Sequence, residues 1–270
     1  MFKSNFKTGL YFNLEEGVYR SDGALSTSDL KYLAKTNPEH FKAQTEGKLP
    51  FRKSPAMELG SQFHMYILER ERWDKETIVR PDEYKDGRLK ATKEWNKEHA
   101  HLEIVSAHNM AAIEAMSERW ESMEEVQALV DPKYEVSAVA KGHRKGIDAK
   151  CRIDVLAGDT VVDIKTTRAG GANPWTFKRT VRDLRYHWQE QNYRNIAKAA
   201  GREIKHWYWA VIETEAPYDY AVYDLVPQDL VMAEAELEKA YNTMIACGEL
   251  NSWPNYTPTE SRSISIYGNL

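Results

Sequence analysis

The chain has 270 residues, 42% of them hydrophobic and 29% charged, which is typical of a globular protein with a substantial core. No apolar run approaches the roughly 20 residues of a membrane span, and the first residues lack a signal-peptide pattern. Cys151 and Cys247 form neither a metal-ligand pair nor a disulfide framework, so a cytoplasmic location without a membrane partner is expected. The formal net charge of −4 does not by itself indicate a nucleic-acid-binding protein, and such a function would require local clusters of positive charge.

The amino-terminal half of the chain is dominated by helical patterns. Apolar spacing and capping residues predict helices over residues 27–36, 38–46, 55–73 and 104–129. The first is capped by Ser26 or Thr27, and the second opens at Pro38. The strongly charged stretch 74–100 is expected to be loop with a short helix.

From residue 134 the period changes to two. Strands are expected over residues 134–141, 147–156, 160–167, 204–213 and 220–226, the first three as an antiparallel meander. Helical patterns return over residues 174–184, 187–200 and 227–250, and the tail 253–270 has no clear period. This order predicts one α/β domain with a central, mainly antiparallel or mixed sheet flanked by helices. Its helical amino-terminal part would span about 25–130, and its sheet with the later helices about 133–250.

Charged side chains alternate with apolar ones on two neighbouring predicted strands. One face of strand 147–156 is expected to carry Asp148, Lys150, Arg152 and Asp154. Ile153 and Val155 would share the opposite face, and on the next strand Asp163 and Lys165 would share a face. One explanation is a solvated sheet face with weak cross-strand ion pairs. The other is a divalent-metal site, where carboxylates bind the ion and the lysine meets phosphate charge or orients a water molecule.

Two clusters of basic residues flank these strands. The segment 141–152 contains one acid and the bases Lys141, Arg144, Lys145, Lys150 and Arg152. The segment 178–185 contains one acid and the bases Lys178, Arg179, Arg182 and Arg185. A run of charge is often only a solvated face. The position of both clusters beside the acidic strands favours contact with a nucleic-acid backbone, and the DNA-binding residues we expect are Arg144, Lys150, Arg152, Arg179 and Arg182.

Two short motifs on predicted helices supply further polar groups. In GSQFH, Gly60 precedes His64 by about one helical turn. Such a histidine is often structural, but a glycine inside a helix costs about 1 kcal/mol and leaves room for a group to approach the imidazole. In HWQEQNY, Gln189 and Tyr193 share one helical face. The structural alternative there is a surface glutamine and a half-buried tyrosine.

Together these motifs resemble a known superfamily. Asp154 followed by Asp163-Ile164-Lys165 resembles the D…(D/E)xK core of the PD-(D/E)xK nucleases, which implies a restriction-endonuclease-like core. The flanking GxxxH and QxxxY motifs resemble the RecB-like branch. Within it the chain most resembles RecE-type exonucleases, through LSTSDLKYLAKTNPEHF, MELGSQFHMYILER, KCRIDVL…VVDIKTT and YHWQEQNY. The residues after His64 and the carboxy-terminal tail depart from the family pattern.

The resemblance implies roles for individual residues. The implied ligands of Mg²⁺, or of Mn²⁺, are His64, Asp154, Asp163 and the main-chain carbonyl of Ile164. The implied catalytic set is Asp154, Asp163, Lys165, Glu135, Gln189 and Tyr193. Lys165 would position or deprotonate the attacking water and balance the charge that develops on the phosphate. Glu135 matches an acidic position near the metal, while Gln189 and Tyr193 would support the substrate and the lysine.

The expected activity is that of a metal-dependent exodeoxyribonuclease that degrades linear double-stranded DNA from an end, 5′-to-3′, in phage-type recombination. The resemblance also implies a closed homo-oligomeric ring that threads DNA through a locally basic channel, and a single-strand annealing protein as a partner. Two alternatives stay open: an endonuclease of the same fold, restriction- or repair-like, and a catalytically inactive DNA-binding or assembly module. The intact set of Asp154, Asp163 and Lys165 argues against the inactive module.

Overall fold

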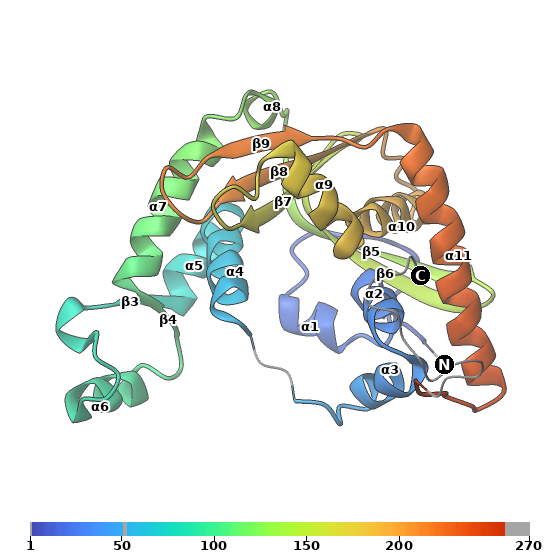
Figure 1. The fold of residues 1–270 in the computed structure, drawn as a ribbon, viewed down its shortest axis with the longest axis horizontal. Helices are drawn as coiled ribbons and strands as arrows, with labels where there is room; N and C mark the ends of the chain where they lie inside the picture. Colours follow the sequence, from blue (N-terminus) through green and yellow to red (C-terminus); the bar gives the residue numbers. More distant parts are fainter. Residues whose placement is uncertain (1, 51–52, 257–270) are drawn as a thin grey trace, which may run out of the picture.

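The computed structural model describes residues 2–50 and 53–256. A seven-stranded sheet lies at its centre, in the order β1-β5-β6-β7-β8-β9 with β2 paired to β6 (Figure 1). Its strands are β1 (Gly9–Tyr11), β2 (Leu25–Ser26), β5 (Lys133–Arg144), β6 (Ile147–Ala157), β7 (Thr160–Thr167), β8 (His206–Glu213) and β9 (Tyr220–Tyr223). β5, β6 and β7 form an antiparallel meander, β7 and β8 are parallel, and β8 and β9 are antiparallel. The prediction of a mixed α/β fold is confirmed.

The hairpin of β5 and β6 follows from its turn residues. Arg144 pairs with Ile147, which leaves Lys145 and Gly146 as a two-residue turn. Both have positive φ, 46° and 81°, as a type I′ hairpin turn requires. The register shifts between Ala140 and Arg144, so the end of the hairpin is irregular.

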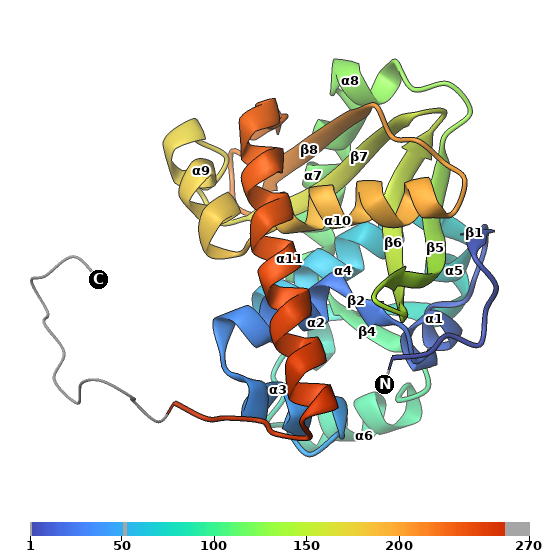
Figure 2. The ribbon, with the colours of Figure 1, turned by 90° about the vertical axis from the view of Figure 1, so that its right-hand side faces the viewer.

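Helices cover both faces of the sheet. In Figure 2, α10 (Tyr186–Ala199) and α11 (Pro227–Glu249) lie in front of the sheet, and α4 (Pro55–Leu68) and α7 (Ala107–Glu121) lie behind it. Buried residues of α9 (Pro174–Asp183) and α10 pack on one face, and buried residues of α4 and α7 pack on the other. The remaining α-helices are α1 (Glu16–Ser21), α2 (Thr27–Lys35), α3 (Pro38–Thr45), α5 (Arg70–Glu76), α6 (Lys90–Glu98) and α8 (Glu124–Gln127).

Two predicted helices are interrupted. The helix expected over 55–73 ends at Leu68, because Glu69 adopts φ −128° and ψ 52°, outside the helical region, before α5 begins. Where one helix was expected over 104–129, the structure has a strand, β4 (Glu103–Ser106), followed by the two helices α7 and α8. The Ser106 hydroxyl accepts a hydrogen bond from the main-chain N–H of Asn109 at 3.0 Å, and this cap fixes the start of α7.

A small second sheet was not predicted. β3 (Thr77–Arg80) pairs in parallel with β4, next to a 3₁₀ turn (Asp82–Tyr84), within a region expected to be loop or helix.

Cys151 and Cys247 are both buried and free. Among the described helices, none combines the length and the apolar character that crossing a membrane demands. Most of the predicted irregular tail, residues 257–270, lies outside the described part of the chain.

Candidate active site

The two acidic strand positions come together at one end of a short ladder. β6 and β7 pair from Ala157↔Thr160 to Val155↔Val162, and Asp154 and Asp163 follow directly on the two strands. Asp154 Oδ2 accepts a hydrogen bond from the main-chain N–H of Ile164 at 2.8 Å. A side chain therefore satisfies this N–H where the ladder ends, and it fixes the Asp154 carboxylate beside β7.

The alternation of side chains along β6 changes phase at Asp154, which corrects the predicted faces. Ile153 packs in the cluster with α9 and α10, whereas Val155 packs in the cluster with α4 and α7. The pairs on either side of Glu135 place it opposite Asp154, and its φ of 50° lies in the left-handed region that non-glycine residues rarely adopt. Such strain is commonly found at functional sites. The simple alternation assumed from the sequence missed this irregularity.

Asp163, Lys165 and Gln189 form one hydrogen-bonded group. Asp163 is 1% exposed, and its Oδ1 accepts a hydrogen bond from Gln189 Nε2 at 2.6 Å. The Lys165 ammonium is ion-paired with Asp163 Oδ2 and donates to Gln189 Oε1 at 3.3 Å. Burial alone would lower the pKa of Lys165, but Asp163, Tyr186 and Asp154 hold it above its ordinary value. The lysine is thus a fixed cation in the cleft.

His64, Glu135 and Asp154 form a group that could hold a metal ion. One ligand atom from each lies within 4.8 Å of the others, and His64 Nδ1 is 3.9 Å from Asp154 Oδ2. Glu135 belongs to this group, whereas the predicted ligand Asp163 does not and contacts Lys165 instead. Ile164, whose carbonyl was a further predicted ligand, lines the same cleft.

The chemistry of this group fits a hard divalent cation. Burial lowers the pKa of His64, which keeps the imidazole neutral as metal binding requires. Burial, with the charge of Asp154 added, raises the pKa of Glu135 to about 7. Burial and the nearby Asp163 also raise the pKa of Asp154. Crowded carboxylates of this kind are stabilised in their charged form by a cation, and carboxylate oxygens suit Mg²⁺ or Mn²⁺.

Gly60 allows helix α4 to lie close to strand β7. A Cβ atom at this position would lie 2.9 Å from the Thr166 hydroxyl on β7. The glycine therefore lets α4 approach β7 closely enough to bring His64 to the acidic group. The group that approaches Gly60 is therefore Thr166 of β7, which the sequence did not indicate.

Arg152 and Lys31 support the site, and neither position was predicted in that role. Arg152 is ion-paired through Nε with Glu135, and its NH1 donates to the Leu14 carbonyl at 2.7 Å. Lys31 of α2 donates to Gln189 Oε1 at 3.2 Å, and burial, then the charge of Lys165, lowers its pKa to about 7. No sequence motif pointed to Lys31, apart from its place in a segment that resembles the family.

Three of the five predicted DNA-binding bases are engaged within the protein. Lys150 is 5% exposed, and its ammonium donates to the carbonyls of Tyr19 at 2.7 Å and Asp22 at 2.6 Å. Arg144 binds Glu234 at 2.6 Å and Glu238 at 3.0 Å on α11. With Arg152 held by Glu135, each of these three bases already has oxygen partners within the protein, and contact of Arg144, Lys150 and Arg152 with DNA stays a prediction.

Most of the predicted catalytic and metal-binding residues line an open cleft. This cleft has a volume of about 850 Å³ and is lined by Asp154, Glu135, His64, Lys165 and Tyr193, among others. Tyr193 packs edge-on against Trp207, with ring centroids 5.9 Å apart. Arg179 and Arg182 are exposed on α9. Further bases that line the cleft, which the sequence did not single out, are Arg20, Lys53, Arg72 and Arg168.

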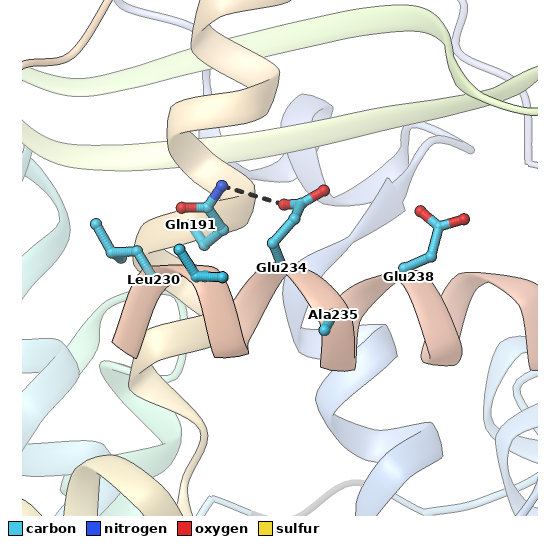
Figure 3. Close-up of a pocket in the computed structure, with 6 residues that line it drawn as sticks. Gln191, Leu230, Glu234, Ala235 and Glu238 are labelled. Carbon is cyan, nitrogen blue, oxygen red and sulfur yellow. Dashed lines mark hydrogen bonds between the residues drawn. The ribbon is translucent and has the colours of Figure 1, made fainter. Parts of the chain in front are cut away.

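A second hollow lies between α10 and α11, away from these residues. It has a volume of about 480 Å³ and is lined by Gln191 and by Leu230, Val231, Glu234, Ala235 and Glu238 (Figure 3). Gln191 Nε2 donates to Glu234 Oε2 at 3.1 Å, as the figure shows. Both of its glutamates are ion-paired with Arg144. Its polar groups are therefore engaged in holding the β5–β6 hairpin to α11.

Comparison with known proteins agrees with the site. The family model described as "PDDEXK-like domain of unknown function (DUF3799)" matches residues 26–261. No curated protein sequence gives a significant match. Among solved structures, the chain is similar to a crystal structure described as "Putative exonuclease" from Eubacterium rectale, with a TM-score of 0.61 and 18% sequence identity over 95% of this chain and 97% of that one. At this identity the likeness shows a shared fold.

Proposed function

Because the chain belongs to the family of PDDEXK-like domains, we propose that it is a metal-dependent exodeoxyribonuclease that degrades linear double-stranded DNA from an end. The observation that carries the proposal is the gathering of His64, Glu135 and Asp154 beside the Asp163–Lys165 pair in one open cleft. Family, fold and this residue set support a nuclease. Digestion of defined DNA substrates and metal titration test the acceptance of DNA ends and the choice of metal.

Different residues of the chain would bind the metal, stabilise charge and position groups during phosphodiester hydrolysis. His64, Glu135 and Asp154 would hold the divalent cation, with the Ile164 carbonyl and Asp163 as the further ligands proposed. A bound Mg²⁺ or Mn²⁺ supplies charge stabilisation at the scissile phosphate and activates a water molecule. Lys165 holds a positive charge where negative charge develops, and it orients the attacking water. Gln189 fixes the lysine and Asp163 through its two amide atoms.

Digestion of three forms of one plasmid tests the proposed reaction. Linear, nicked and covalently closed DNA are incubated with Mg²⁺, with Mn²⁺ and with EDTA. Loss of linear DNA only, and only with metal, is expected. Cutting of closed circles would favour the endonuclease, and absence of any hydrolysis would favour the inactive DNA-binding module. Asp163→Asn and Lys165→Ala are matched controls that should stay folded and lose at least about 99% of the rate.

The proposal also includes the polarity of DNA degradation and the oligomeric state of the protein. Duplexes labelled at the 5′ or the 3′ end distinguish the polarities, and early release of the 5′ label is expected for the 5′-to-3′ reaction in phage-type recombination. A homo-oligomeric ring would give a mass several times 31.2 kDa in light scattering. A single-strand annealing protein is the proposed partner, and co-elution of the two proteins on linear DNA would test it.

His64 provides a test of the metal site that does not depend on DNA. His64→Ala should weaken Mn²⁺ binding about 10–100-fold in calorimetry, because an imidazole ligand suits softer ions. Unchanged Mn²⁺ affinity together with lowered thermal stability would make His64 a structural residue instead. Gln62→Ala on the same helix removes a side chain that contacts Glu103 and Asn109 rather than the acidic group, and it controls for damage to α4.

A further inference from the structure

The helix α9 carries a tryptophan on its charged face. Phe177 and Val181 are 4% and 8% exposed and hold the helix against the sheet cluster. At 100° per residue, the opposite side presents one stripe made of Trp175, Lys178, Arg179 and Arg182, which we call the α9 stripe. Trp175 is 78% exposed, although an indole of this size normally contributes to a core.

This exposure sets Trp175 apart from the other tryptophans. Five others are less than a tenth exposed: Trp73, Trp120, Trp188, Trp207 and Trp209. Trp95 and Trp253 are partly buried and stack on His99 and Phe41 respectively. Trp175 has no such ring partner among the described residues. Its flat apolar surface is therefore available to a molecule outside the chain.

The charges around Trp175 are largely uncompensated. The side chains of Lys178 and Arg179 are exposed and form no ion pair or hydrogen bond with any residue in the described part of the chain. The Arg182 side chain is 76% exposed and, among the residues that the structure describes, forms an ion pair only with Asp183, at 3.4 Å. An aromatic surface surrounded by free cations matches a ligand that combines flat rings with negative charge.

The α9 stripe lies on a helix whose surroundings border the proposed active site. Arg168, which follows β7 and precedes α9, lines the cleft that contains Asp154 and Lys165. Leu184, which directly follows α9, lines the same cleft. In Figure 1, α9 lies in front of the ends of β7 and β8. Only residues 169–173 separate Arg168 at the cleft from the first residue of α9.

We propose that the α9 stripe binds single-stranded nucleic acid, with a base stacked on Trp175 and phosphates on Lys178, Arg179 and Arg182. Aromatic platforms combined with a basic track are the usual means of binding single strands without sequence preference. Bases inside a duplex are already stacked on each other, so the indole selects an unpaired strand. The inference rests on the proposed function, since removing one strand of a duplex leaves the other unpaired beside the cleft.

Binding measured in EDTA tests the inference without hydrolysis. Titration with a 15-residue oligothymidylate should quench the tryptophan fluorescence of the wild type, and most of the quenching should disappear in Trp175→Phe. Trp175→Ala should lower affinity for the same oligonucleotide at least about fivefold in fluorescence anisotropy, and affinity for a blunt duplex by less than twofold. Phe12→Ala, which removes another exposed aromatic ring outside α9, should change neither.

The outcomes separate this inference from the nuclease proposal. Unchanged affinity of Trp175→Ala for the single strand would overturn it, as would an equal loss for single strand and duplex. A change in oligomeric mass with unchanged DNA binding would also overturn it, because Trp175 would then belong to a subunit interface. Failure of the wild type to digest linear DNA, with the single-strand binding intact, would overturn only the proposed nuclease function.

Discussion

The two basic clusters look alike in the sequence, but the arginines and lysines predicted to bind DNA have different surroundings in each. In the first, residues 141–152, Lys150 and Arg152 are turned inward onto oxygen atoms of the protein, and Arg144 is bound to two glutamates of α11. In the second, residues 178–185, Arg179 and Arg182 are exposed on an outer helix. Composition alone cannot separate these cases.

The difference lies in what the fold places opposite each cluster. The β5–β6 hairpin is enclosed by α11, with its row of glutamates, and by α1, whose last carbonyls receive the Lys150 ammonium. A cation at the carboxyl end of a helix satisfies carbonyls that the helix leaves free. α9 has only Asp183 within ion-pair distance of its bases, among the described residues. A basic run therefore indicates a DNA path only where the protein offers no internal counterpart.

The largest effect is expected from removing Lys150, which tests whether the first basic cluster has a structural role. Lys150→Ala should lower the free energy of unfolding by roughly 2–4 kcal/mol, because the carbonyls of Tyr19 and Asp22 lose their donor in a buried place. Urea denaturation measures the effect. Lys145→Ala is the control from the same cluster: it is exposed, bonds only Asn242, and should change stability by less than about 0.5 kcal/mol. Equal stability of both variants would contradict the structural role.

Arg152 comes next in expected effect. Arg152→Ala frees the Glu135 carboxylate, and we expect metal affinity and cleavage rate to fall about 10–100-fold while duplex affinity in EDTA stays the same. Arg152→Lys should recover only part of the activity, since a lysine cannot reproduce the contacts to both Glu135 and Leu14. Calorimetry with Mn²⁺ and single-turnover rates provide the readouts. A loss of duplex affinity as large as the loss of rate would instead restore Arg152 as a DNA contact.

For the exposed bases of α9, we expect unchanged stability and weaker DNA binding, the reverse of what is expected for Lys150 and Arg152. The double variant Arg179→Ala with Arg182→Ala should keep its stability and weaken binding to all duplex sequences alike. The log–log slope of affinity against salt should flatten by about 1.8, because two phosphate contacts are lost. Metal affinity should not change, because neither residue is near the acidic group. A salt slope equal to that of the wild type would make α9 a solvated face and remove the contrast between the clusters.

The sequence was most informative where local pattern and chemistry agree. The β5–β6–β7 meander follows from period-two strands joined by turns such as Lys145-Gly146. The positions of Asp154, Asp163 and Lys165 follow from their spacing on two adjacent strands, and the structure brings them together with His64, Glu135 and Gln189. Motif order allowed residues more than 100 positions apart to be assigned to one site.

What the sequence could not provide depends on tertiary contacts. The phase change at Asp154 lies opposite Glu135, whose backbone is left-handed, and the residue types at these positions do not indicate this irregularity. The interruption at Glu69 coincides with its contact to Arg72 in the next helix, an arrangement invisible to helical periodicity. The inward turn of Lys150 depends on α1, a six-residue helix that has no buried residues and was not predicted. Lys31 lies at the site because α2 packs on α10, which carries Gln189.

The last prediction concerns His143, which lies in the first basic cluster, residues 141–152. Burial, and then the charge of Arg144, lowers the pKa of His143 to about 4. Between that value and about 6.5, the unfolded chain binds a proton at His143 that the folded chain does not. The contribution of His143 to stability is therefore fully present above about pH 6.5 and is lost as the pH falls toward 4, by at most about 1.4 kcal/mol per pH unit.

His143→Gln should remove this component, so the difference in unfolding free energy between wild type and variant should change between pH 7 and pH 4.5 and stay level above pH 7. Urea denaturation at four pH values measures it, with the exposed His101→Gln as the matched control. Parallel pH profiles for wild type and His143→Gln would mean that the histidine is open to solvent in solution. The hairpin end would then be as exposed as α9, and the contrast between the two basic clusters would be confined to Lys150 and Arg152.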